Sequence, residues 1–476
     1  MSKRNLIIII IAIVIIIIGF FAFSSFFGAP NQPGSTTTGT NFISNLLPFG
    51  KSNNSATSTG TPSTNVSGYV APTAATPIQQ KLIKVSSMPI AGFGIFMKQR
   101  FVTVPVVIPA VNTTPTPSAT SSSPTSTQNT NTTATTKSTS SKTTSSKNKT
   151  KTAAPTPPPT ESVPALRYVA RATGNIYETF ADTINETQFT NTVIPEVYDA
   201  YFANNCSSVA MRYLNEDGKT IETFIGALPQ EVLGDDSIEN NTLTGSFLPE
   251  NITNINISPD TKSLFYLFNL GNNESSAGIT ADSLGNKKVQ VFSSPLTEWL
   301  STWPNSRMIT LTTKASNGIP GYMYAVDPDK KDFNKILGNI NGLTTLTSPS
   351  GKLVLYSDDN LALSVFNTGT NQSTSLGVKT LPEKCVWGEA NDIIYCAVPK
   401  SIDQTGYPDI WYQGQVSFAD DIWMINVTNG TSNMISDPTA EVGQDIDGIK
   451  LALDQNEEYL FFINKKDSYL WKLSLK

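Results

Sequence analysis

Histidine is absent from all 476 residues of this chain. Histidine is the side chain most often used as a general acid or base near neutral pH, and it is the commonest metal ligand. Its absence excludes Ser-His-Asp and Cys-His nucleophilic sites and every metal site that needs imidazole. The acidic clusters Asp327-Pro328-Asp329 and Asp358-Asp359-Asn360 lack the ligand spacing and distal Glu of a calcium loop. We therefore expect no metal and no cofactor.

Acidic residues are absent from the first 160 positions, which contain 12 Lys or Arg. All 38 acidic residues follow, so a basic N-terminal part precedes an acidic body. Nucleic-acid binding needs clustered Lys and Arg that neutralise phosphates, and an acidic body does not supply them. We expect no nucleic acid as a partner, and we interpret the acidic surface as an ordinary solvated one.

Cysteine is scarce, with only Cys206, Cys385 and Cys396 in the chain. Cys385 and Cys396 flank the turn Gly388–Asp392, and the register of the apolar runs around this turn places them opposite each other. Opposite residues on antiparallel strands have Cβ atoms about 4.5–5.5 Å apart, which is somewhat more than the ~3.8 Å of a disulfide. Two alternatives remain, a disulfide or two buried free thiols. Cys206 is expected to be unpaired.

Charged residues are absent from Leu6–Phe23, a run of eighteen residues dominated by isoleucine. At about 1.5 Å per residue, such a run just spans a ~30 Å hydrocarbon core. A cleaved signal peptide has a shorter apolar core and a small-residue exit site, of which Ser24-Ser25-Phe26 is a poor version. We predict a transmembrane helix over residues 6–27 that anchors the protein in the cell membrane. Lys3 and Arg4 keep residues 1–5 cytoplasmic by the positive-inside rule, so the C-terminal domain is extracytoplasmic.

Apolar periodicity is missing from two segments. Residues 28–78 are rich in Ser, Thr, Asn, Pro and Gly, and residues 112–160 are dominated by Thr, Ser and Pro. Such compositions cannot bury enough apolar surface to offset the entropy lost on folding. We predict a disordered tether over 28–78. The island between the two segments is too short to fold alone, so 112–160 is predicted to be a disordered insertion within the folded domain.

The remaining sequence repeats a hairpin of two apolar runs around a short polar turn. Pro259, Pro304 and Pro349 each mark one such turn, including Trp303-Pro304-Asn305, and they are spaced by 45 residues. Four strands in about 45 residues are typical of a propeller blade. The pattern predicts an all-β fold, a β-propeller over residues 79–476 with seven blades, and six or eight blades are the alternatives. The expected blades begin near Ile90, Val197, Ile255, Leu300, Leu346, Cys385 and Leu451.

The last expected blade lacks an outer strand, because the chain ends after its third apolar run. The run Lys81–Ser86 has the character of an outer strand and no other partner. We predict that it completes blade 7 and closes the ring, because closure removes exposed strand edges. The insertion over 112–160 then joins the first two strands of blade 1. It leaves the propeller on the face opposite to the connection Lys400–Ala419.

Two resemblances accompany this pattern. The Ser258-Pro259-Asp260-x-Lys262 turn and its counterpart at Ser348 resemble the WD40-like repeats of TolB-type propellers. The segments Arg167–Tyr177 and Cys385–Pro399 resemble uncharacterised membrane-anchored propeller proteins of uncultured bacteria. These resemblances imply a propeller fold, and neither implies a known function.

Candidate catalytic carboxylates are Asp199, Asp260 and Asp454, which fall near the ends of expected inner strands. A carboxylate glycosidase needs two facing acids about 5–9 Å apart. Asp residues at such positions are more often turn formers that accept hydrogen bonds from nearby backbone. Without a recognisable catalytic motif we assign no catalytic residue and expect no enzyme. A carboxylate-dependent envelope hydrolase is the alternative.

Aromatic residues gather in Lys400–Ala419, which contains Tyr407, Trp411 and Tyr412. Exposed aromatic side chains beside polar groups suit contacts with protein or carbohydrate. The alternative is that they pack against blade 6 and hold the loop in place. On the first interpretation the protein is a membrane-anchored binding or scaffolding module of the cell envelope. Its partner is an unknown protein or glycan, expected on the outward loop face that carries Lys400–Ala419.

Overall fold

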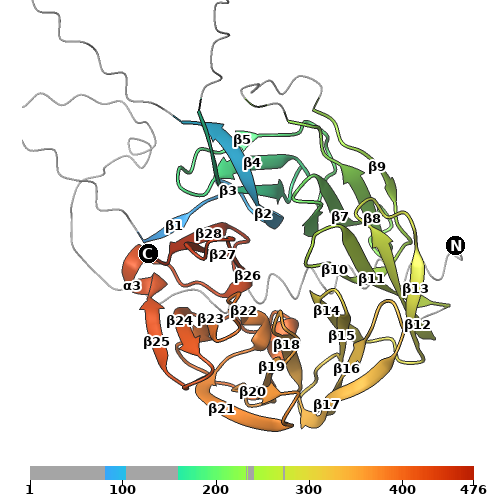
Figure 1. Ribbon diagram of the computed structural model, residues 1–476, viewed down its shortest axis with the longest axis vertical. Coiled ribbons are helices and arrows are strands. Elements are labelled where there is room, and N and C mark those ends of the chain that lie inside the picture. Colours follow the sequence, from blue (N-terminus) through green and yellow to red (C-terminus); the bar gives the residue numbers. More distant parts are fainter. Residues whose placement is uncertain (1–80, 103–158, 232, 234–240, 272–273) are drawn as a thin grey trace, which may run out of the picture. The chain divides into compact units, whose positions relative to one another are not determined.

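The fold is a ring of seven four-stranded antiparallel sheets (Figure 1). The computed structural model describes residues 81–102, 159–231, 233, 241–271 and 274–476. Each sheet is one blade, with its first strand beside the central channel. The prediction of an all-β propeller with seven blades is therefore confirmed, and the alternatives of six or eight are wrong.

The strands of each blade follow one another in the chain, except in blade 7. From the inner strand outward, blades 1 to 3 are β2 (Ile90–Phe101), β3 (Thr160–Ala170), β4 (Ile176–Phe180) and β5 (Thr187–Gln188); β6 (Asp199–Ala203), β7 (Ser208–Leu214), β8 (Ile221–Ala227) and β9 (Thr244–Phe247); β10 (Ile252–Ile257), β11 (Ser263–Leu270), β12 (Ser275–Asp282) and β13 (Val289–Ser294). Blades 4 to 7 are β14 (Trp299–Asn305), β15 (Met308–Thr313), β16 (Pro320–Val326) and β17 (Phe333–Asn341); β18 (Thr344–Thr347), β19 (Leu353–Ser357), β20 (Ala362–Asn367) and β21 (Gln372–Lys379); β22 (Cys385–Trp387), β23 (Ile393–Pro399), β24 (Asp420–Asn426) and β25 (Ser432–Ser436); β26 (Gly448–Leu453), β27 (Tyr459–Asn464), β28 (Leu470–Ser474) and β1 (Leu82–Lys84). Short helical turns are η1 (Pro382–Lys384), α2 (Asp409–Tyr412) and α3 (Pro438–Val442).

The ring is closed by β1, which forms the outer strand of blade 7. Leu82 pairs with Leu473 and Lys84 pairs with Trp471, antiparallel to β28. The Leu82 side chain is fully buried among residues of blades 6 and 7. The predicted closure by Lys81–Ser86 is confirmed, and it joins the two ends of the propeller domain by main-chain hydrogen bonds.

The core is divided among the blade interfaces. Each of the seven contacts between neighbouring blades has its own buried cluster. Blades 1 and 2 approach most closely through Gly92 and Gly94 on β2. A Cβ atom on Gly92 would lie 2.1 Å from the Ala200 carbonyl oxygen, and one on Gly94 would lie 2.5 Å from the Cys206 sulfur. Glycine is required there because the strands leave no room for a side chain.

Two details differ from the sequence prediction. Pro304 lies within β14, and the chain turns at Ser306 and Arg307 instead. The pairing of β14 with β15 is irregular between Thr302 and Asn305, which is where a residue without an N–H is tolerated. Thr160, assigned to the insertion, is the first residue of β3.

Several predictions fall outside the described residues. These are the transmembrane span over 6–27, the tether over 28–78 and nearly all of the insertion over 112–160. In the described ranges, no helix combines the length and apolar character needed to cross a membrane.

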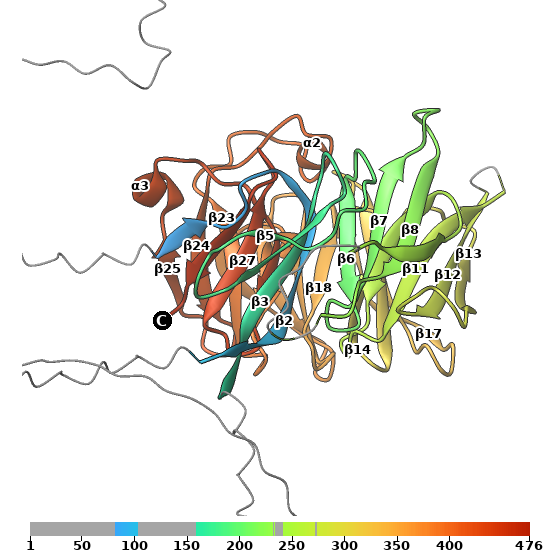
Figure 2. The same ribbon diagram turned by 90° about the horizontal axis from the view of Figure 1, so that it is seen from above.

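The propeller has two faces that carry different connections. Because the strands of a blade alternate in direction, the turns after first and third strands emerge on one face and those after second strands on the other. Figure 2 shows α2 on the upper face, whereas the β2–β3 hairpin extends to the lower face. The names upper face and lower face are used in this sense below.

Candidate functional site

The aromatic loop of blade 6 is packed down onto the upper face. Tyr407 and Trp411 are only 4% and 5% exposed, and they belong to one buried cluster with Leu361, Leu381 and Phe418. The expectation of an exposed aromatic rim is wrong for these two residues. The loop lies over the gap between blades 5 and 6, and covering their apolar residues stabilises it more than solvent exposure would.

Hydrogen bonds to Asp447 and Glu383 also hold this loop against the upper face. Asp447 accepts hydrogen bonds from Trp411 Nε1 at 3.0 Å and from the Phe418 backbone N–H at 3.1 Å. The half-buried Tyr412 donates its hydroxyl to Glu383. Burial raises the pKa of Tyr412 well above its usual value, and the neighbouring Glu383 charge raises it further. The Trp411 indole N–H and the Tyr412 hydroxyl are therefore both used to fix the loop.

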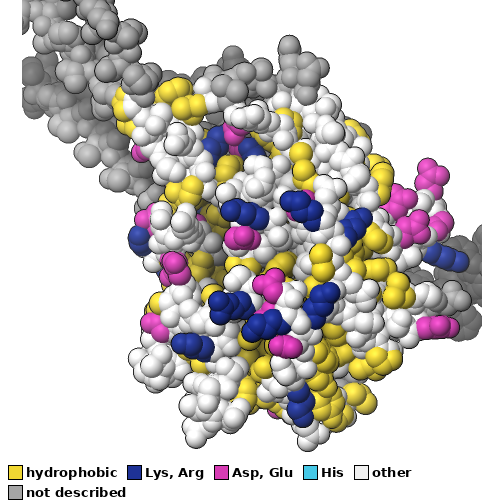
Figure 3. Space-filling view, turned by 45° about the vertical axis from the view of Figure 1, so that its right-hand side comes forward, with side chains coloured by type: hydrophobic (Ala, Val, Ile, Leu, Met, Phe, Trp, Pro, Cys, Tyr) yellow, Lys and Arg dark blue, Asp and Glu magenta, His cyan; other side chains and the backbone are white. Residues whose placement is uncertain are grey.

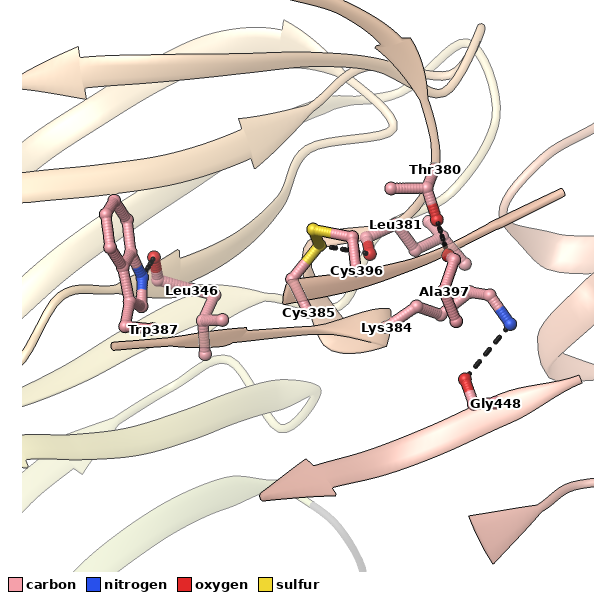
Figure 4. The surroundings of a disulfide bond; sticks show 9 residues. All are labelled: Leu346, Thr380, Leu381, Lys384, Cys385, Trp387, Cys396, Ala397 and Gly448. Carbon is pink, nitrogen blue, oxygen red and sulfur yellow. Dashed lines mark hydrogen bonds between the residues drawn. A yellow bond between two sulfur atoms is a disulfide. The ribbon is translucent and has the colours of Figure 1, made fainter. Parts of the chain in front are cut away.

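Cys385 and Cys396 are joined by a disulfide between β22 and β23 (Figure 4). The register pairs these two residues directly, as predicted, with Cα atoms 4.0 Å apart. Trp387 Nε1 donates to the Leu346 carbonyl oxygen at 3.2 Å, which ties this part of blade 6 to blade 5. Cys206 is free and buried. The disulfide thus belongs to a packed region and not to a surface site.

A cavity of about 440 Å³ in the central channel is lined by residues of β2, β6, β10 and β26. Asp199, at the start of β6, accepts hydrogen bonds from Arg212 at 3.1 Å and Tyr201 at 2.7 Å, and it pairs with Lys450. Among the described residues, no Asp or Glu lines this cavity.

The other two candidate carboxylates are turn formers. Asp260 accepts from the Ser258 hydroxyl at 2.6 Å and from the Lys262 backbone N–H at 3.1 Å. Asp454 accepts from the backbone N–H groups of Glu458 and Tyr459 at 2.8 and 2.6 Å. The structure therefore does not bring the three carboxylates together as a catalytic pair.

A large groove lies on the lower face, over blades 3 and 4 and the first turn of blade 5. Its volume is about 920 Å³, which is in the range of ligand sites. The three repeated prolines, Pro259, Pro304 and Pro349, all line it, together with Pro328 and Trp303. Figure 3 shows one side of the molecule, where basic and acidic side chains are interspersed among hydrophobic ones.

The polar lining of the groove comes from the turns that the repeat generates. Lys262 follows the first strand of blade 3, whereas Lys287 and Lys331 follow the third strands of blades 3 and 4. Asp282 and Asp327 begin the turns that carry Lys287 and Lys331. Each carboxylate accepts hydrogen bonds from backbone N–H groups two or more residues further along the chain. They are 45 residues apart, so equivalent turns on adjacent blades present equivalent lysines.

Charges in the groove are balanced and the lysines are available. Lys262, Lys287 and Lys331 are exposed and have no ion pair among the described residues, while Asp260, Asp282 and Asp329 line the same groove. The Ser258 hydroxyl and the Lys262 N–H lower the pKa of Asp260, so it is charged at neutral pH. The groove therefore presents both donors and charged acceptors with little net charge.

Trp303 contributes an aromatic surface to the groove. It packs against the buried cluster between blades 3 and 4 and is only partly covered. Its indole N–H is buried and has no hydrogen-bond partner among the described residues. In the sequence, Trp303 is recognisable only as part of a turn; the signal that could have found it is the 45-residue repeat, which brings Trp303 and all three prolines to one face.

The described part of the chain contains no cluster of three or more Cys, Asp or Glu that could hold a metal ion. Turn-forming hydrogen bonds occupy most of the carboxylates discussed above.

Comparison with known proteins finds propellers among solved structures. No protein-family model and no curated protein matches the chain. An oligogalacturonate lyase in complex with manganese is 8% identical, with a TM-score of 0.44 over 66% of this chain and 85% of that one. The oligogalacturonate lyase of Vibrio parahaemolyticus is 8% identical, with a TM-score of 0.45 over 66% and 86%. The β-propeller domain of the trilobed protease of Pyrococcus furiosus is 12% identical, with a TM-score of 0.43 over 66% and 92%. Since no family model matches, the resemblance to TolB-type repeats rests on the turns at Ser258 and Ser348.

Proposed function

We propose that this protein is a glycan-binding module of the cell envelope and that the lower-face groove binds a hydroxyl-rich, uncharged oligosaccharide. The observation that carries the proposal is the combination of Trp303 with unpaired lysines and charged aspartates in one open groove. Aromatic faces pack against the apolar faces of sugar rings, and pairs of donors and acceptors bind hydroxyl groups. Balanced charge disfavours a strongly acidic or basic ligand.

The N-terminal part of the chain does not supply this ligand. The proposed ligand is an uncharged oligosaccharide, whereas residues 1–160 are a polypeptide stretch that contains lysine and arginine but no acidic residue. We therefore expect the ligand to come from outside the chain. Anchoring through residues 6–27 and an extracytoplasmic location remain part of the proposal.

Binding assays on the purified full-length chain test this function. Calorimetry with neutral hexasaccharides of glucose, mannose, galactose and N-acetylglucosamine should find at least one ligand. The double variant Lys262→Gln, Asp329→Asn removes one donor and one acceptor from the groove. Hydrogen bonds to charged groups contribute about 1.5–3 kcal/mol each, so binding should weaken at least ~10-fold.

The matched control is Lys335→Gln, Asp332→Asn, which changes the same residue types in blade 4 outside the groove lining. It should bind as the unmodified protein does. Equal weakening in both variants, or no binding of any neutral hexasaccharide, contradicts the proposal. Binding of polyglutamate in preference to sugars would instead identify an acidic peptide as the ligand.

A carboxylate-dependent envelope hydrolase is the alternative function. It needs two facing carboxylates, and the channel cavity has none among its described lining residues. No observation favours it over binding.

A further inference from the structure

Three ionisable side chains meet beneath the aromatic loop with no exposure to water. Lys384 ends η1, Asp420 begins β24 and Asp447 precedes β26, and all three are 0% exposed. Lys384 Nζ lies 2.8 Å from Asp420 Oδ2 and also contacts Asp447. The rings of Trp411 and Phe418 cover the nitrogen, with centroids 5.4 and 5.3 Å away. This cluster plays no part in the lower-face groove.

The two carboxylates of the cluster are held differently. Asp447 accepts from Lys384, Trp411 Nε1, the Ser417 hydroxyl and the Phe418 N–H. Asp420 uses only Oδ2, which accepts from Lys384 and from the Gly448 N–H at 2.7 Å, whereas its buried Oδ1 has no partner. An ionised carboxylate with an unpartnered buried oxygen is costly, because that oxygen has lost its hydration.

The pKa values of the two carboxyl groups are shifted in opposite directions. Burial raises the pKa of Asp420 to about 6, although the nearby Lys384 opposes the shift. Burial also acts to raise the pKa of Asp447, but Lys384 and the donors around it outweigh this, so the pKa lies below its ordinary value. Asp420 is therefore the carboxyl group that more readily becomes neutral, and Asp447 is the one that stays ionised.

We propose that Lys384 and Asp420 form an intramolecular amide bond, with Asp447 as the acid–base group. Transfer of one ammonium proton to Asp420 Oδ1 turns the buried ion pair into an amine and a carboxylic acid. The Lys384 nitrogen then attacks Asp420 Cγ and forms the N–C bond. Asp447 takes a proton from that nitrogen and passes it to the Oδ1 hydroxyl, which leaves as water when the C–Oδ1 bond breaks. Atoms and charge balance, since an ammonium and a carboxylate become one amide and one water.

The surrounding groups suit this reaction. Oδ2 becomes the amide oxygen and keeps its hydrogen bond from the Gly448 N–H, which also stabilises the oxyanion that forms during attack. Fixed contact between nitrogen and carboxyl group provides the high effective concentration of an intramolecular step. The site excludes water, so the amide is not readily hydrolysed, and the product removes a buried ion pair that is costly to desolvate. Figure 4 shows Lys384 pointing towards Gly448 at the start of β26.

Peptide mass spectrometry of the reduced, full-length protein tests the bond. We expect trypsin not to cleave after Lys384, and we expect one branched species that joins the Lys384 and Asp420 peptides with a mass one water below their sum. Separate, unmodified Lys384 and Asp420 peptides would overturn the proposal. This measurement does not depend on any processing of the N-terminal part of the chain.

Two variants make the test specific. Asp447→Asn removes the acid–base group and should leave the two peptides separate. Lys450→Met, the control, removes a lysine that pairs with Asp199 in a more exposed setting, and it should leave the branched species intact. If Asp447→Asn does not fold, the peptides of the unmodified protein still show whether the Lys384–Asp420 amide has formed. A branched species in Asp447→Asn equal in amount to that of the unmodified protein would remove Asp447 from the mechanism and contradict the proposal.

Discussion

Cys206 shows how strongly a single residue's chemistry depends on its surroundings. It lies in the cluster between blades 1 and 2, and burial raises the pKa of its thiol to about 12. Position 94 requires glycine, because the Cys206 sulfur occupies the space that a side chain there would need. At the same scale, Lys384 is a residue type that ordinarily faces water, yet here it is buried because it pairs with Asp420 and Asp447.

The thiols provide a prediction at this scale. A thiol reacts as the thiolate, so the native protein should not react with iodoacetamide at pH 8. Unfolding without reductant should expose one reactive thiol, Cys206, and unfolding with reductant should expose three. Alkylation followed by mass spectrometry counts them. Three reactive thiols without reductant would show that Cys385 and Cys396 are not bonded in the protein.

At the scale of the elements, the short strand β1 has a large effect, because it closes the ring. It spans only Leu82–Lys84, yet it supplies the outer strand that blade 7 lacks. Additional hydrogen bonds from Val85 to Leu470 and from Ser474 to Lys81 extend the pairing beyond the strand. A propeller left open here would expose the edge of β28 to other chains.

Removing or weakening β1 tests its role. Deletion of residues 79–88 should open the ring and produce an aggregating protein. Leu82→Ala is the milder change, and loss of a fully buried leucine should cost about 2–5 kcal/mol in the free energy of unfolding. Denaturant unfolding and light scattering measure the two effects. If the deletion variant stays monomeric with an unchanged melting temperature, closure by β1 is not needed for the fold.

At the scale of the whole molecule, the two faces of the propeller carry different features. β1 begins on the lower face, and the β2–β3 connection leaves from the same face, which also contains the groove. The upper face carries α2 and the packed loop above blades 5 and 6 (Figure 2). If residues 6–27 anchor the chain as proposed, we expect the lower face, where β1 begins, to be turned towards the envelope and its glycan polymers.

Labelling of intact cells tests this orientation. Cysteines introduced by Ser401→Cys on the upper face and Lys288→Cys on the lower face are both at exposed positions. A membrane-impermeant maleimide should label the first faster, because the second faces the envelope. The native cysteines do not interfere, since Cys206 is buried and the others are bonded. Equal rates, or faster labelling at position 288, would contradict the orientation.

The sequence by itself determined the architecture, because a blade is a local unit whose strands pair with their neighbours in the chain. The 45-residue spacing of Pro259, Pro304 and Pro349, the register of Cys385 with Cys396 and the unpaired run at Lys81 were sufficient for the blade count and the closure. The blade count and the closure depend on strand pairing and on apolar alternation along short stretches of chain. Both are visible in the composition and spacing of the sequence.

Only the tertiary structure decided where the sites are. The groove gathers turns of three blades, and the Lys384–Asp420–Asp447 cluster gathers residues 36 and 63 positions apart, at distances that the ring geometry sets. Whether Trp411 faces solvent or the core depends on the apolar surface that blades 5 and 6 leave uncovered, and nothing in residues 400–419 encodes that surface. The burial of a side chain and its hydrogen-bond and ion-pair partners are set by the assembled ring. Side chains of the same type in the sequence therefore differ in what they can bind.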